Sequence, residues 1–104
     1  MPPLTVTVIT LNEAANIEAC LASVAWADER VVIDSGSTDD TVARATAAGA
    51  RVLIRDWPGY AAQKNLAAGK ASHDWILSID ADERVPQALA NEIRQILTTP
   101  PAAA

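Results

Sequence analysis

The segment Leu4–Thr10, which reads LTVTVIT, decides the fold class because nearly all of its residues are β-branched and apolar or small. A run of this kind, without regular alternation of charged residues, is typical of a strand buried on both faces of a parallel sheet. Three further segments of similar character follow it, and they are Arg30–Asp34 (RVVID), Ala50–Ile54 (ARVLI) and Asp74–Ile79 (DWILSI). The sequence therefore predicts four strands.

Segments with apolar residues at helical spacing lie between and after these strands. The predicted helices are Glu13–Val24, Ser37–Ala48, Tyr60–Ala68 and a last one that begins at Pro86 and runs through Leu97. We expect Asn12 to cap the first helix and Gly49 to end the second. The order βαβαβαβα with short connections predicts one Rossmann-like, three-layer α/β domain, in which helices cover both faces of a parallel sheet. This domain is expected over residues 1–98, with a loose tail over residues 99–104.

Length, composition and charge limit the function. A chain of 104 residues corresponds to one domain, and half of its residues are apolar. It has no apolar run near the roughly 18 residues of a membrane span and no basic segment like that of a signal peptide. Cys20 is the one cysteine, so neither an internal disulfide nor a zinc site is expected, and a cytoplasmic location is favoured. The net charge of −5 argues against nucleic-acid binding.

The residues that follow each strand are the candidate site residues, because ligands of open α/β sheets bind beyond the carboxyl ends of the strands. These segments are Leu11–Glu13, Asp34–Ser37, Trp57–Gly59 and Asp80–Asp82. Carboxylates such as Asp80 and Asp82 suit Mg²⁺ or Mn²⁺, which usually bind one or two carboxylates together with phosphate oxygens. A cation would also let an acidic domain bind an anionic ligand. The alternative is that Asp80–Asp82 is an ordinary polar turn.

Other polar residues have both a functional and an ordinary interpretation. Asp34 could accept hydrogen bonds from a base or a ribose, or belong to a plain strand-to-helix turn. Lys64 could reach a phosphate, or be a surface lysine. Cys20 and Trp75 are expected in the core. The dinucleotide-binding, P-loop, nucleophile-elbow and HExxH motifs are absent from the sequence.

Four motifs, taken together and in this order, resemble those of family 2 glycosyltransferases. They are Ile9–Glu13 (ITLNE), Asp34–Asp39 (DSGSTD), Gln63–Asn65 (QKN) and Ile79–Glu83 (IDADE). Trp26–Glu29 (WADE) and Asp56–Gly59 (DWPG) are similar to the branch that adds glucose to the lipopolysaccharide core. The resemblance extends from about Leu4 to Pro86.

The resemblance implies the N-terminal, donor-binding half of a GT-A fold, a nucleotide-diphosphate sugar as donor, with a UDP-sugar expected, and Mg²⁺ or Mn²⁺. The residues implied in substrate binding are Thr10, Asn12, Glu13, Asp34, Ser35, Lys64 and Asp80, and those implied in metal binding are Asp80 and Asp82. Ser35 stands where the family often has a second aspartate. The implied acceptor is a glycan or a lipid-linked lipopolysaccharide core, which would bring the full enzyme to the inner face of the inner membrane.

A complete GT-A domain is longer than this chain, and the resemblance implies that its catalytic base lies in the second half. No residue here is therefore assigned as the base. A rival hypothesis is a catalytically silent α/β domain that forms a homo-oligomer through an exposed sheet edge. A third is a phosphotransfer domain with Asp80 as nucleophile, which is disfavoured because Arg84 stands where a small hydroxyl residue is expected.

Overall fold

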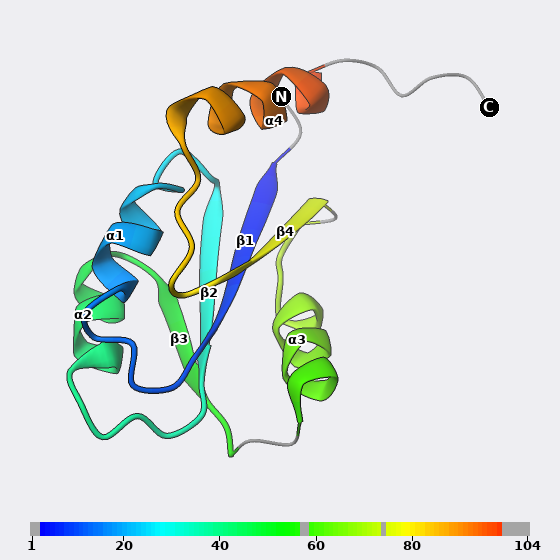
Figure 1. The fold of residues 1–104 in the computed structure, drawn as a ribbon. Helices are drawn as coiled ribbons and strands as arrows, with labels where there is room; N and C mark the ends of the chain where they lie inside the picture. Colours follow the sequence, from blue (N-terminus) through cyan, green and yellow to red (C-terminus); the bar gives the residue numbers. More distant parts are fainter. Residues whose placement is uncertain (1–2, 57–58, 74, 99–104) are drawn as a thin grey trace.

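The computed structural model describes residues 3–56, 59–73 and 75–98, and its four strands form one parallel sheet (Figure 1). The strands are β1 (Leu4–Thr10), β2 (Glu29–Asp34), β3 (Arg51–Ile54) and β4 (Trp75–Asp80). Their order across the sheet is β3-β2-β1-β4, so β1 is central. Val8 of β1 lies opposite Val32 of β2 and Ile79 of β4. The parallel pairing brings the carboxyl ends of all four strands to one edge.

Helices cover both faces of the sheet, as the sequence predicts. They are α1 (Ile17–Ala22), α2 (Thr41–Ala47), α3 (Tyr60–Gly69) and α4 (Gln87–Thr98). Figure 1 shows α1 and α2 together on one side, α3 on the other, and α4 beside the amino end of β1. Among the described residues, no helix is both long and apolar enough to span a membrane. The predicted tail over 99–104 lies outside the described residues.

The core has two parts, because successive residues of a strand point to opposite faces of the sheet. Leu4, Val6 and Val8 of β1 pack with buried residues of α1, α2 and α4 on one face. On the other face, Val31 and Ile33 of β2 pack with residues of α3. Cys20 is fully buried in the first part, which confirms its predicted place in the core.

Arg30 of β2 holds the ends of two helices. Its Nη1 donates a hydrogen bond of 3.1 Å to the carbonyl of Leu21, and its Nη2 donates one of 2.7 Å to the carbonyl of Ala48. A cation at the carboxyl end of a helix is favourable because the last carbonyl groups carry partial negative charge. Gly49 ends α2 as predicted, with a φ of 94°, and a Cβ there would lie 2.9 Å from Arg30 Nη2. The positive φ favours glycine at this position, and a larger residue would also displace the Arg30 guanidinium from its place at the helix ends.

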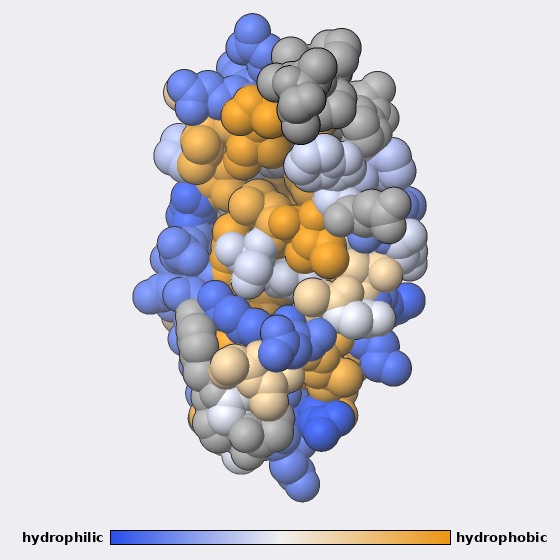
Figure 2. Space-filling view, turned by 90° about the vertical axis from the view of Figure 1, so that its right-hand side faces the viewer, coloured by the Kyte–Doolittle hydropathy of each residue, from blue (hydrophilic) through white to orange (hydrophobic). Residues whose placement is uncertain are grey.

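The edge strand β4 leaves apolar side chains at the surface. Trp75 is 50% exposed and Ile76 is 40% exposed. The prediction that Trp75 lies in the core is therefore wrong. The physical reason is that β4 pairs with β1 alone among the described strands, so its start lies at the rim of the sheet. Figure 2 views this side of the molecule and shows apolar residues gathered on it.

Candidate functional site

The loop after β1 is held by the loop after β2. Asn12 adopts a left-handed backbone conformation with a φ of 54°. Its Oδ1 accepts a hydrogen bond of 2.8 Å from the backbone N–H of Thr38, and its own N–H donates to Ser37 Oγ at 2.8 Å. Asn12 therefore does not cap a helix, and the helix expected from Glu13 begins only at Ile17.

Two more hydrogen bonds join these loops. The backbone N–H of Glu13 donates to Thr41 Oγ1 at 2.9 Å, and that of Ala14 donates to Asp39 Oδ2 at 3.2 Å. Consecutive N–H groups after β1 are thus bound by side chains from the segment that leads into α2. The interlocked loops give the site a fixed shape before any ligand binds.

Asp34 is fully buried at the end of β2, and both of its carboxylate oxygens accept hydrogen bonds. Oδ1 accepts from Thr10 Oγ1 at 2.7 Å and from Ser37 Oγ at 2.5 Å. Oδ2 accepts from the backbone N–H groups of Gly36 at 3.0 Å and Ser37 at 2.7 Å. Burial acts to raise the pKa of Asp34, but the hydrogen bonds from Ser37, Thr10 and Gly36 outweigh it and lower the pKa. Asp34 thus organises the turn instead of presenting an open acceptor to a base or ribose.

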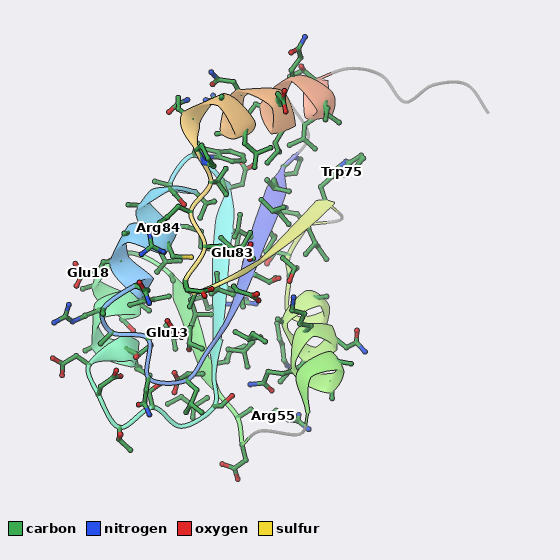
Figure 3. The ribbon with its side chains drawn as sticks, in the orientation of Figure 1. Glu13, Glu18, Arg55, Trp75, Glu83 and Arg84 are labelled. Carbon is green, nitrogen blue, oxygen red and sulfur yellow. The ribbon has the colours of Figure 1, made fainter. Side chains whose placement is uncertain are left out.

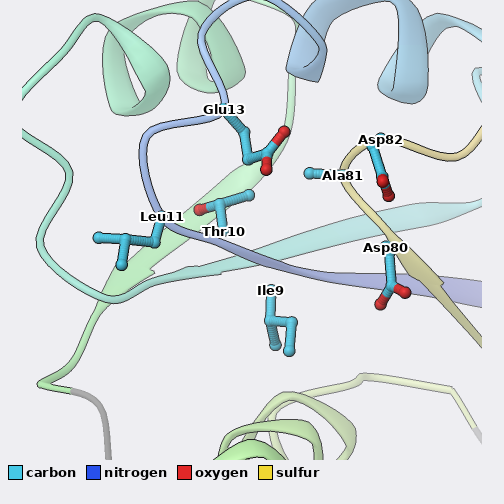
Figure 4. A pocket seen from close by; sticks show the side chains of 7 residues that line it. All are labelled: Ile9, Thr10, Leu11, Glu13, Asp80, Ala81 and Asp82. Atoms are coloured by element: carbon cyan, nitrogen blue, oxygen red, sulfur yellow. The ribbon is translucent and has the colours of Figure 1, made fainter.

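A pocket of about 450 Å³ lies where β1 and β4 end. Its lining residues are Ile9, Thr10, Leu11, Glu13, Asp80, Ala81 and Asp82. Figure 4 shows the carboxylate of Glu13 arriving from the loop after β1, and those of Asp80 and Asp82 from the end of β4. The volume is within the range of small-molecule sites. The pocket combines apolar walls with three carboxylates.

The turn that carries Asp80 and Asp82 is fixed by its own hydrogen bonds. Glu83 Oε1 accepts from the backbone N–H of Asp80 at 2.6 Å, and the N–H of Glu83 donates to the carbonyl of Asp80 at 2.9 Å. The thiol of Cys20 also donates to this carbonyl at 3.6 Å. Burial raises the pKa of Cys20 to about 11, so the group is a neutral thiol that acts as a donor. The turn is therefore attached to the core beneath it.

A polar bridge joins the two walls of the pocket. Arg84 Nη2 donates to Asn16 Oδ1 at 3.2 Å, and Asn16 Nδ2 donates to Glu13 Oε2 at 3.0 Å. Arg84 also donates to the carbonyl of Ala81 at 3.2 Å. Figure 3 shows Glu13, Glu83 and Arg84 on the same side of the sheet. The bridge sets the position of the Glu13 carboxylate relative to the turn after β4.

Lys64 of α3 approaches the site from the other face of the sheet. Its Nζ lies 3.7 Å from Asp80 Oδ1, and the two side chains are 31% and 46% exposed. Lys64 is thus more than a solvated surface lysine. It places a positive charge beside the carboxylate that the sequence singles out.

The structure brings most of the predicted residues to one place. Thr10, Glu13, Asp80 and Asp82 line the pocket. Asn12, Asp34 and Ser35 form the neighbouring strand ends, where the N–H of Ser35 donates to the carbonyl of Thr10 at 2.9 Å. Trp57 lies outside the described residues.

Several residues of the site have roles that could not be assigned from the sequence. Asn16, Glu83 and Arg84 position others through hydrogen bonds, and Ile9 and Leu11 supply apolar walls. Leu11 is 54% exposed and lies at the wall of the pocket. The available signal for these two was their position at the strand end, since Ile9 lies near the end of the predicted strand Leu4–Thr10 and Leu11 directly follows it.

The carboxylate oxygens that line the pocket are ligands that suit a hard divalent cation. Among residues 3–56, 59–73 and 75–98, no three histidine, cysteine, aspartate or glutamate side chains are grouped to hold a metal. A cation at Asp80 and Asp82 would thus take one or two ligands from the protein and the others from water or a phosphate group. Mg²⁺ and Mn²⁺ are commonly bound in this way, so these residues fit such an ion.

Comparison with known proteins places the chain in a group of sugar-transferring enzymes. The family model described as glycosyl transferase family 2 matches residues 5–104. A glycosyltransferase of Rickettsia felis with no assigned reaction is 45% identical over 100 residues, which cover 95% of this chain and 35% of that protein. A lipopolysaccharide core biosynthesis glycosyltransferase of Rhizobium meliloti is 40% identical over 100 residues, covering 91% of this chain and 37% of that protein. The chain spans about a third of the length of these relatives.

A solved structure has the same fold. Glucosyl-3-phosphoglycerate synthase of Mycobacterium tuberculosis, in complex with Mn²⁺, UDP and glucosyl-3-phosphoglycerate, superimposes with a TM-score of 0.77 at 33% identity. The match covers 93% of this chain and 40% of the synthase. The same synthase has been solved with Mn²⁺, UDP-glucose and phosphoglyceric acid. The parallel sheet with flanking helices is therefore that of a GT-A glycosyltransferase.

Proposed function

The chain belongs to glycosyl transferase family 2, and from this we propose that it is the donor-binding part of a glycosyltransferase, which holds a UDP-sugar with the help of Mg²⁺ or Mn²⁺. The observation that carries the proposal is the pocket at the carboxyl edge of the sheet, where Glu13, Asp80 and Asp82 meet apolar walls. The location agrees with the general rule for ligand binding in such sheets. The Mn²⁺ and UDP bound by the mycobacterial synthase support the choice of ligand.

Asp80 and Asp82 are the proposed metal ligands. Their carboxylates would share the cation with the diphosphate of the donor. The cation would neutralise the negative charge of the diphosphate, which this acidic chain would otherwise repel. Lys64, 3.7 Å from Asp80, supplies a second positive charge beside the place proposed for the diphosphate. Thr10, Asn12, Glu13 and Ser35 are proposed to contact the nucleoside from the ends of β1 and β2.

The proposed reaction is a displacement at C1 of the sugar. A hydroxyl oxygen of the acceptor forms a bond to C1, the bond from C1 to the diphosphate oxygen breaks, and the nucleoside diphosphate leaves. When bound, the cation stabilises this leaving group. No residue of this chain is proposed as the base that removes the hydroxyl proton. A glycan of the lipopolysaccharide core is the proposed acceptor, supported by the Rhizobium meliloti relative.

We expect UDP to bind the chain only when Mn²⁺ or Mg²⁺ is present, because the pocket has three carboxylates and would otherwise repel a diphosphate. Isothermal titration calorimetry with Mn²⁺, with Mg²⁺ and with EDTA measures this directly. A titration of Mn²⁺ with uridine in place of UDP is the control for binding that does not involve the diphosphate. UDP binding of equal strength in EDTA would refute the role of the cation.

A second candidate function, self-association without catalysis, is favoured by the exposed edge of the sheet. Trp75 and Ile76 on β4 are about half exposed, and among the described strands β4 has a neighbour on one side only. Unpaired strand edges and exposed apolar groups promote association between chains.

If self-association uses β4, Ile76→Lys should weaken it by about tenfold or more, since a charge would replace an apolar contact. Multi-angle light scattering over a range of protein concentrations measures the change. Ile54→Lys is the matched control, because Ile54 is 67% exposed at the end of β3, on the opposite edge of the sheet. A wild-type chain that stays monomeric at every concentration would exclude this second function.

A further inference from the structure

The side chain of Gln63 on α3 is fully buried, although half of its amide has no partner. Its Nε2 donates a hydrogen bond of 3.2 Å to Ser35 Oγ. Its Oε1 has no hydrogen-bond partner in the part of the chain that the structure describes. A buried carbonyl without a donor destabilises a protein, and an apolar side chain of similar size would avoid that cost. Packing alone therefore does not explain a glutamine at this position.

The hydrogen bond from Gln63 limits the hydrogen bonds that the Ser35 hydroxyl can make with a ligand. A serine hydroxyl has one proton to donate and two lone pairs that accept. The amide of Gln63 engages the oxygen of Ser35, which leaves the hydroxyl proton directed elsewhere. Within residues 3–56, 59–73 and 75–98, no hydrogen bond donated by this hydroxyl is present.

Ser35 is also the polar side chain at the end of β2 that remains open to a ligand. It is half-buried, whereas the neighbouring Asp34 is fully buried and accepts four hydrogen bonds from the protein. Its backbone N–H is bound to the carbonyl of Thr10, which fixes the residue against the end of β1. The Ser35 oxygen is thus held by Gln63 and the Ser35 backbone by Thr10, and the hydroxyl proton is available to a ligand.

We propose that Gln63 is a positioning residue that sets the nucleobase preference of the site, by holding the Ser35 hydroxyl as a donor toward a base carbonyl. This inference rests on the proposed function, in which the nucleoside lies across the ends of β1 and β2. Uracil has a carbonyl oxygen at the position where cytosine has an amino group. Because Gln63 already occupies one lone pair of Ser35, donation of the hydroxyl proton to a carbonyl completes its hydrogen bonding, whereas an amino group is accepted only if that proton turns away and the remaining lone pair faces the base.

The test compares UDP with CDP by calorimetry in the presence of Mn²⁺. The wild-type chain should prefer UDP by about tenfold or more in Kd, and Gln63→Met should reduce this preference to about threefold or less. Ser35→Ala should have the same effect, and the double variant should be no worse than either single variant, because Gln63 acts through Ser35. Gln87→Met, a change in an exposed glutamine of α4, is the matched control.

Thermal unfolding separates this role from a structural one. Gln63→Met should unfold at the wild-type temperature or above it, since the unpartnered Oε1 is removed. If Gln63→Met and Gln63→Leu both fail to fold, the residue is structural and the inference is overturned. The inference is also overturned if Gln63→Met keeps the wild-type preference, or if the wild-type chain prefers CDP; metal-dependent binding in those cases still supports the proposed function. A wild-type chain that binds neither nucleotide would refute the proposed function itself.

Discussion

Replacing Asp82 with asparagine is expected to weaken the Mn²⁺-dependent binding of UDP by about a hundredfold or more. Asp82 is exposed and lines the pocket at the end of β4. Asparagine keeps the size of the side chain but removes the negative charge that a hard cation requires. The loss should therefore appear in metal binding, measured by calorimetry with Mn²⁺ alone, as well as in nucleotide binding.

Asp40→Asn is the matched control for this experiment. Asp40 precedes α2, is exposed, and makes no capping hydrogen bond through its side chain. The same change in charge at this position should leave UDP binding at the wild-type level. Wild-type affinity for Mn²⁺ in Asp82→Asn would show that Asp82 is not a metal ligand, and the assignment would pass to Asp80 alone.

Asp34→Ala is expected to lower the free energy of unfolding by about 3 kcal/mol or more, which is a large part of the roughly 5–15 kcal/mol that stabilises a domain. The change leaves four hydrogen-bond donors without their acceptor beneath the turn after β2. Asp34→Asn should cost less, about 1–2 kcal/mol, because the hydroxyls of Thr10 and Ser37 can rotate and accept from the new amide. Urea unfolding at neutral pH measures both changes.

The same residue should make stability depend on pH in acid. The pKa of Asp34 is lower in the folded chain than the ordinary value of 3.8. Its contribution is therefore present in full above the unfolded pKa and is lost as the pH falls through the folded pKa. Between pH 5 and pH 3, urea unfolding should show a smaller decrease in stability for Asp34→Asn than for wild type. Parallel curves would contradict the assigned role of the carboxylate.

Much of the fold could be predicted because the strands carry local signals. In the segment Leu4–Thr10 every residue after Leu4 is β-branched, and Gly49 ends α2 where the sequence places the stop. The position of the site followed from topology, since parallel strands bring Asp80 and the end of β1 to one edge. These features depend on neighbouring residues or on the order of the elements.

The remaining features depend on contacts between distant residues. Asparagine is common at the N-caps of helices, but the side chain of Asn12 is bound by Thr38, 26 positions later. The helix α1 begins only at Ile17. Trp75 belongs to an apolar segment, and its exposure depends on what lies beyond β4 in space. The burial of Gln63 and its link to Ser35 likewise join positions 28 residues apart. None of these contacts leaves a pattern in the sequence near the residue concerned.

The interlocked loops after β1 and β2 also have a consequence for the order of folding. Their hydrogen bonds join residues 25 to 28 positions apart, so the chain must close a large loop before they can form. The pairing of β1 with β2 brings the two loops together, and the edge proposed to bind the nucleotide can be completed only afterwards. The helices, whose hydrogen bonds are local, need not wait for that step. A partly folded chain would therefore have helical structure before the proposed nucleotide site is complete.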